Sequence, residues 1–181
     1  GKYRDDVRCF LKGDGGMATQ LTYRMLGSPD LYQPDERGEC ASVNFITCHD
    51  GFTLHDLFSY NAKHNEANGW ENTDGDNNNS WNCGEEGETE NQDVNNLRRR
   101  LQKNAVTVLM CSRGTPMFLA GDEFGNSQFG NNNAYCQDNE ISWLNWDDLE
   151  KNQDLYHFFR YMIHFRKKHP ILRRHTRSAK S

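Results

Sequence analysis

The stretch V-N-F-I-T-C-H-D-G, from Val43 to Gly51, sets the fold of this chain. Its β-branched and aromatic residues favour an extended backbone, and Gly51 follows them as a stop signal. An apolar run this short predicts a buried strand over Val43–Cys48. The last residues of such a strand emerge at its carboxyl end, where parallel α/β proteins carry their chemistry. His49 and Asp50 are therefore the first candidates for an active site.

A second strand is predicted over Met117–Ala120, and Asp122 and Glu123 follow it directly. A helix over Val94–Ser112 separates the two strands, since its apolar residues recur at helical spacing. The order strand, helix, strand predicts two parallel strands joined by a helical crossover. Asp50, after the first strand, and Asp122 and Glu123, after the second, then lie at the same edge of the sheet. This α/β layout is that of a (β/α)8 barrel with about two βα units present.

The flanking segments are a mixture of helices and polar loops. A short helix is predicted at Ala18–Leu26, and a long one at Asp154–Lys168. A second short helix is predicted after Thr53, which would cap it together with Asp56, three residues further on. Residues 1–16 are expected to form a loop with about one helical turn. Two long polar segments, residues 63–92 and 124–148, show almost no periodicity, and loops of this length are usually functional.

Composition excludes several classes of protein. The net charge of −5 argues against nucleic-acid binding, and no apolar stretch approaches membrane-spanning length. The basic residues from Arg166 to Arg177 are interpreted as helix-end and tail charge, with an anion site as the less favoured alternative. Six cysteines at irregular spacings predict no zinc site and reduced thiols in a cytoplasmic protein. We expect no signal peptide at the start of the chain.

No metal or other cofactor is predicted. Asp74, Asp76, Asn78 and Glu85 do fall at EF-hand positions one, three, five and twelve. However, Asn79 occupies the position where the EF-hand needs glycine, and flanking helices are absent. No glycine-rich phosphate loop is present either.

The two strand ends and their loops suit a neutral polyhydroxyl ligand. Aromatic rings stack on the C–H faces of sugars, while carboxylates, amides and imidazoles bond to hydroxyls. Besides Asp50, the candidate substrate-binding residues are His49, Asp122, Glu123, Asn132 and Tyr135. Structural alternatives remain open: loop capping for Asp122 and Glu123, and packing for Tyr135, Trp143 and Trp146. The arginines Arg98 to Arg100 are interpreted as the solvent face of their helix, and His55 and His64 as residues that orient loops.

Several motifs closely resemble the isoamylase and bacterial glycogen debranching branch of the α-amylase superfamily. F-I-T-C-H-D resembles the superfamily signature on the seventh barrel strand. H-D-G-F-T-L-H-D-L-F-S-Y-N-A-K-H-N, S-W-N-C-G-E-E-G and G-N-N-N-A-Y-C-Q-D-N-E-I-S-W-L-N-W match the debranching branch. The resemblance covers nearly all of residues 3–172. It implies that residues 1–172 are the C-terminal part of a catalytic barrel, with strands seven and eight, and that 173–181 form a tail.

The resemblance also implies a chemistry. The superfamily cleaves α-glucosidic bonds with retention, using a carboxylate nucleophile, a general acid and a third aspartate. Asp50 corresponds to the third aspartate, which stabilises the transition state, and His49 would bond to the same sugar. The debranching branch acts on α-1,6 branch points of glycogen, amylopectin or limit dextrin.

The motifs for the nucleophile and the general acid do not occur in these 181 residues. The resemblance places both upstream, so we expect the isolated chain to be inactive. The exposed edges of an incomplete barrel predict self-association. A non-catalytic glucan-binding or regulatory piece is the alternative interpretation.

Overall fold

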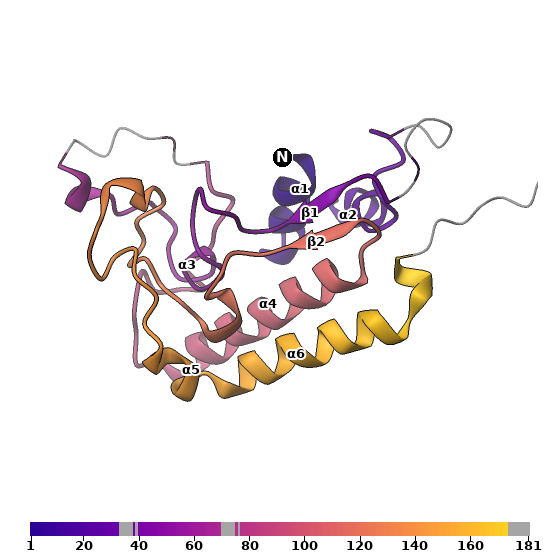
Figure 1. Ribbon diagram of the computed structural model, residues 1–181. Helices are drawn as coiled ribbons and strands as arrows, with labels where there is room; N and C mark the ends of the chain where they lie inside the picture. Colours follow the sequence, from indigo (N-terminus) through magenta and orange to yellow (C-terminus); the bar gives the residue numbers. More distant parts are fainter. Residues whose placement is uncertain (33–37, 39, 70–74, 76, 174–181) are drawn as a thin grey trace, which may run out of the picture.

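Two short parallel strands lie at the centre of the molecule, as the sequence predicts. The computed structural model describes residues 1–32, 38, 40–69, 75 and 77–173. Strand β1 (Val43–Phe45) pairs in parallel with β2 (Thr115–Met117), with Val43 opposite Thr115 and Phe45 opposite Met117. Helix α4 (Gln92–Cys111) lies between them in sequence and alongside them in space (Figure 1). The predicted βαβ connection is therefore confirmed.

Both strands differ in extent from the prediction. β1 ends three residues before the predicted Cys48, and β2 begins two residues before the predicted Met117. The early start of β2 follows from Gly114, whose φ of +112° suits glycine. A Cβ at Gly114 would lie 2.5 Å from the carbonyl oxygen of Ser42, so only glycine lets the two chains approach this closely.

The two faces of the strand pair differ in burial. Asn44 is fully buried on the face that α1 covers, and its Nδ2 donates to the carbonyl of Arg113 over 2.6 Å. On the other face, Val43 and Met117 are 53% and 39% exposed. Since alternate residues of a strand point to opposite faces, one side of the sheet is packed and the other is open.

The prediction of a loop over residues 1–16 was wrong, because α1 (Lys2–Leu11) is a ten-residue helix. Tyr3, Val7 and Leu11 recur every four residues and are buried together in the main core. The charged residues between them made this apolar periodicity hard to recognise in the sequence. Helix α2 (Ala18–Met25) agrees with the prediction and packs against α1.

Helices α4 and α6 (Gln153–Lys168) lie side by side beneath the strands (Figure 1). The predicted long helix is confirmed as α6, and Leu155, Phe159 and Met162 form its buried stripe. Arg166 lies in the last turn of α6, as its interpretation as helix-end charge predicted, but the sequence did not indicate that it is buried. Its guanidinium is buried and donates to the carbonyls of Met110, Ser112 and Gly114, so it joins the end of α6 to the turn between α4 and β2.

The long polar loops contain only short elements in their described parts, as expected. Within residues 63–92 and 124–148 these are the 3-10 turns η1 (Glu66–Asn68) and η3 (Ala134–Cys136). The 3-10 turn η2 (Asp122–Phe124) and the short helix α5 (Asp147–Lys151) stand at the two ends of the second loop. The other short elements are α3 (Leu54–Leu57) and the 3-10 turn η4 (Pro170–Leu172). Trp70, Asp74, Asp76, Arg174 and Arg177 lie outside the described residues.

The six cysteines are free thiols. None of the helices in the described part of the chain combines the length and the apolar character needed to cross a bilayer.

Candidate active site

The segment after β1 is anchored at its base and exposed at its tip. Arg8 of α1 is buried and donates to the carbonyl of Ile46 through Nε and Nη2, over 2.9 and 2.6 Å. Beyond this anchor, the side chains of His49 and Asp50 are 87% and 72% exposed, with Nε2 of His49 3.2 Å from Oδ1 of Asp50. The structure thus presents the predicted pair to solvent, where a ligand has access to it.

Asp122 contacts both sides of the segment that carries this pair and is 1% exposed. Its carboxylate accepts hydrogen bonds from the hydroxyl of Thr47 and, over 3.0 Å, from the backbone N–H of Leu54. Burial raises the pKa of Asp122 to about 7, against the opposing effect of these hydrogen bonds. The two donors flank residues 48–53, so Asp122 fixes both ends of the segment that carries His49 and Asp50.

Glu123 and Tyr135, two further predicted binding residues, take different positions. Glu123 is half-buried, and its Oε2 accepts from the backbone N–H of Gly121 over 2.8 Å. Tyr135, on η3, is largely exposed. Of the predicted residues besides His49 and Asp50, Tyr135 is the one with a freely accessible side chain.

Asn132 joins the two long loops. Its carbonyl accepts from the N–H of Gly51 over 2.8 Å, so it contacts the His49 segment directly. Its own side chain is buried, with Oδ1 accepting from Asn65 over 2.8 Å and Nδ2 donating to Asn78 over 3.2 Å. Asn132 therefore supports the candidate site from below.

A second buried aspartate was predicted only as a helix-capping partner. Thr53 does accept from the N–H of Asp56 and caps α3, as predicted. The Asp56 carboxylate, however, accepts from Ser127 Oγ over 2.6 Å and from the N–H groups of Gln128 and Gly130. Burial raises the pKa of Asp56 above its ordinary value. Asp56 thus fixes the loop after β2 against α3.

The interpretation of Arg98 as part of a solvent-facing surface was wrong. Its guanidinium is buried and donates to the carbonyls of Asn82, Glu85 and Gly87, which closes the loop before α4. A signal was present in the sequence, because Arg98 falls on the apolar stripe of the helix, four residues after Val94 and three before Leu101.

His55 and His64 orient loops, as predicted. Nε2 of His64 lies 3.0 Å from Oε2 of Glu86, and Nε2 of His55 lies 2.7 Å from Oε1 of Glu88. Burial alone would lower the pKa of His55, but the carboxylates of Glu88 and Asp56 together outweigh burial and raise the pKa above its ordinary value.

Cys48, His49 and Asp50 each bring one potential ligand atom within 4.8 Å of the others. They are consecutive residues, two of them are exposed, and exposed acidic groups are common without an ion. We assign no metal to this group.

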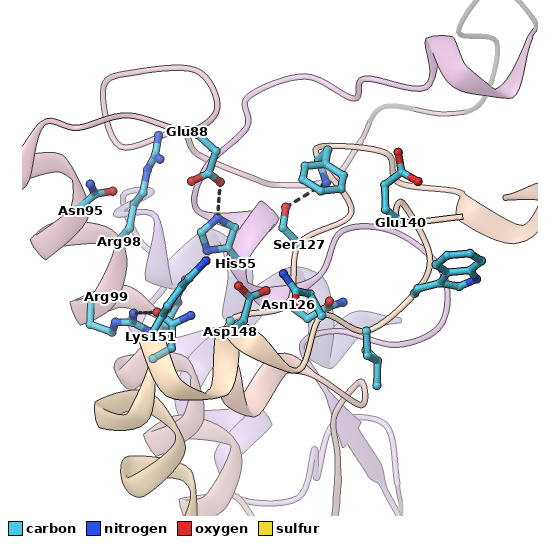
Figure 2. Close-up of a pocket in the computed structure, with 17 residues that line it drawn as sticks. His55, Glu88, Asn95, Arg98, Arg99, Asn126, Ser127, Glu140, Asp148 and Lys151 are labelled. Atoms are coloured by element: carbon cyan, nitrogen blue, oxygen red, sulfur yellow. Dashed lines mark hydrogen bonds and ion pairs between the residues drawn. The ribbon is translucent and has the colours of Figure 1, made fainter. Parts of the chain in front are cut away.

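A pocket of about 800 Å³ lies at the start of α4, between α3, α5 and the loop after η2 (Figure 2). His55, Glu88, Arg99 and Asp148 are among its lining residues, whereas none of the predicted site residues lines it. The exposed pair at the end of β1 and this pocket are therefore separate features.

Comparison with known proteins confirms the resemblance seen in the motifs. The chain is 51% identical over 175 residues to a glycogen operon protein GlgX homolog of Mycobacterium tuberculosis, covering 96% of the chain and 24% of that protein. It is 54% identical over 176 residues to isoamylase 3, chloroplastic, of Oryza sativa, covering 96% of the chain and 22% of the relative. The chain thus spans about a quarter of the length of these relatives. No family model matches it.

A solved structure with a similar fold is the pullulanase from Anoxybacillus sp. LM18-11 complexed with maltotetraose. The TM-score is 0.70 at 24% identity, and the match covers 97% of this chain and 22% of the pullulanase. At this identity the likeness shows the fold alone.

Proposed function

We propose that this chain forms one wall of the active site of an isoamylase-type glycogen debranching enzyme. The proposal follows from the homology of the chain to a segment of such enzymes. The whole enzyme would hydrolyse α-1,6-glucosidic branch linkages in glycogen-like glucans. The exposed pair His49 and Asp50 at the carboxyl end of β1 is the observation that carries this proposal. Residues 1–172 would then be the last two βα units of the catalytic barrel, with β1 and β2 as its seventh and eighth strands.

The open face of the strand pair supports this assignment. In a closed barrel, the side chains that point inward pack against those of the other strands. Val43 and Met117 are apolar and exposed on one face, while α1 covers the other. In a complete barrel, the other strands would cover the exposed apolar face that carries Val43 and Met117.

Asp50 would stabilise the transition state. An oxocarbenium-like sugar carries developing positive charge, which a nearby carboxylate stabilises more strongly than it does the ground state. His49 would bond to the same sugar ring. Asp122 would act as a positioning residue, since it holds the ends of the His49 segment from a buried position.

The ligand would be an α-glucan such as glycogen, amylopectin or a limit dextrin. The maltotetraose in the similar pullulanase belongs to the same chemical class. The free thiols favour a reducing compartment such as the cytoplasm.

The test uses the full-length enzyme that contains this segment. Asp50→Asn removes the charge but keeps the size of the side chain, and it should lower kcat on glycogen by about 10²–10³-fold with little change in KM. The release of reducing ends measures this rate. Activity close to that of the unaltered enzyme would exclude Asp50 from the proposed role.

The isolated 181-residue chain should release no reducing ends from glycogen, because it lacks the nucleophile and the general acid. Retained binding of glucan without hydrolysis in the full-length enzyme would instead favour a non-catalytic, glucan-binding role.

A further inference from the structure

The pocket at the start of α4 has walls from four parts of the chain. α3 contributes His55, the loop before α4 contributes Glu88, α4 contributes Arg99, and α5 contributes Asp148 (Figure 2). Its volume of about 800 Å³ lies within the range of small-molecule sites. The residues discussed below indicate what kind of ligand it suits.

The arginines in its wall already have partners. Arg98 donates to backbone carbonyls of the preceding loop. Arg99 donates to Oδ1 of Asn152, and its Nε lies 3.4 Å from Asp154. These contacts fix the wall in place and occupy several of the N–H donors that an anionic ligand would need.

The charges that line the pocket balance. Glu88, Glu140 and Asp148 are carboxylates, and Arg98, Arg99 and Lys151 are cations. Burial raises the pKa of Asp148, and the nearby Lys151 and His55 oppose this effect. In Figure 2, Glu140 lies on the opposite side of the pocket from Arg99. A balanced lining offers hydrogen-bond donors and acceptors without a net field, which suits a neutral ligand with many hydroxyl groups.

Two exposed aromatic rings complete the lining. Phe129, on the loop after η2, and Trp143, on the loop between η3 and α5, are 52% and 57% exposed. The indole N–H of Trp143 donates to Oδ1 of Asp138 over 3.2 Å, which restricts the orientation of the ring. Phe129 has a φ of +55°, a conformation that side chains rarely adopt. An exposed ring beside carboxylates and amides is a suitable platform for the C–H face of a sugar.

We propose that this pocket is a second glucan-binding site, which takes a segment of an α-glucan chain outside the site at His49 and Asp50. The inference of an α-glucan rests on the proposed function, which supplies the substrate class. Trp143 stacks on one glucose ring, and the carboxylates of Asp148 and Glu140 accept hydrogen bonds from its hydroxyls. The site binds without performing chemistry, and it holds a branched substrate near the reacting centre.

The test measures the binding of maltohexaose to the 181-residue chain by isothermal titration calorimetry. Trp143→Ala should weaken binding about tenfold. Trp146→Ala is the matched control, because Trp146 is 65% exposed, lies three residues along the same segment and does not line the pocket. The control should bind maltohexaose as the unaltered chain does. Thermal melting of both variants checks that the fold is retained.

A second pair of variants tests the chemistry of the ligand. Asp148→Asn keeps an acceptor and removes the charge, so it should retain most of the affinity for a neutral sugar, whereas Asp148→Leu should lose it. Equal binding by the unaltered chain and Trp143→Ala, or no binding of maltohexaose at millimolar concentrations, would overturn the proposal.

The outcome is independent of the activity test. If Asp50→Asn leaves the debranching rate unchanged while Trp143→Ala loses affinity, the proposed function fails and the pocket still binds glucan. If Asp50→Asn abolishes the rate while Trp143→Ala binds maltohexaose normally, the function stands and the second site is wrong.

Discussion

The backbone N–H of Leu54 donates a 3.0 Å hydrogen bond to Oδ1 of the buried Asp122, 68 residues later in the chain. The same carboxylate accepts from the hydroxyl of Thr47. Thr47 and Leu54 stand on either side of the segment that carries His49 and Asp50. One buried side chain therefore sets the position of the exposed candidate site.

The first prediction concerns the pH dependence of stability. The folded pKa of Asp122 is about 7, whereas an unfolded aspartate has an ordinary pKa near 4. The folded state binds the proton more tightly, so protonated Asp122 adds to the free energy of unfolding. This contribution is fully present below about pH 4 and is lost as the pH rises through about 7. Its size is on the order of a few kcal/mol.

Asp122→Asn should remove this pH dependence, because the amide keeps one acceptor for Leu54 and gains a donor toward Thr47. Asp122→Ala should also remove it but should lower stability at every pH, since both donors lose their partner. Urea unfolding between pH 4 and pH 8 measures the difference. An unaltered chain whose stability rises steadily across that range would contradict the assignment.

The second prediction concerns Arg98. Replacement by Ala leaves the carbonyls of Asn82, Glu85 and Gly87 without their buried donor, so the free energy of unfolding should fall by about 3 kcal/mol. Arg100, two residues on, is exposed and is the matched control, with an expected change within about 0.5 kcal/mol for Arg100→Ala. Denaturant midpoints measure both. Similar values for the two variants would refute the buried role of Arg98.

The third prediction compares two glycines with positive φ. Gly114→Ala places a Cβ 2.5 Å from the carbonyl oxygen of Ser42, so the variant should lose about 3 kcal/mol or fail to fold. Gly51 has a φ of +82° but nothing within 4 Å of its Cβ position. Gly51→Ala should therefore cost only about 1 kcal/mol of backbone strain. Thermal melting should rank the variants in this order, and the reverse order would show that close approach at Gly114 is unimportant.

The fourth prediction concerns the open face of the strand pair. Val43 and Met117 expose apolar surface beside unpaired strand edges, so we expect the isolated chain to self-associate. Val43→Lys should shift the population toward the monomer because a buried lysine at the contact is costly. Ile171→Lys is the control, since Ile171 is an exposed apolar residue on η4 and does not belong to the strand pair. Sedimentation at several concentrations measures the shift, and a monomer at every concentration would contradict the prediction.

Local patterns predicted the helices that carry a continuous apolar stripe and the order of the two strands. The stripe of α6 and the cap of α3 by Thr53 depend on residues that are neighbours in sequence, so local physics suffices for them. The prediction missed α1, whose three buried apolar residues stand among seven that are charged, half-buried or exposed. It also misplaced the strand ends, because these depend on pairing with a partner about seventy residues away.

The buried polar side chains lie beyond the reach of a sequence pattern. Charged residues are usually exposed, but the structure buries Arg98, Arg166 and Asp56. Their hydrogen-bond partners come from loops that pack over them in the folded chain. The same is true of the pocket at the start of α4, whose lining comes from residues between His55 and Asn152.

The sequence by itself determined the parallel strand pair, the helical crossover, and the placing of His49 and Asp50 after the first strand, since each follows from periodicity and chain order. The tertiary structure decided which carboxylates are accessible. Asp50 and Asp122 both follow a strand and look alike in sequence, yet Asp50 is exposed and Asp122 is buried between Thr47 and Leu54. Burial depends on what the rest of the chain packs against a side chain, and that requires contacts between residues far apart in sequence.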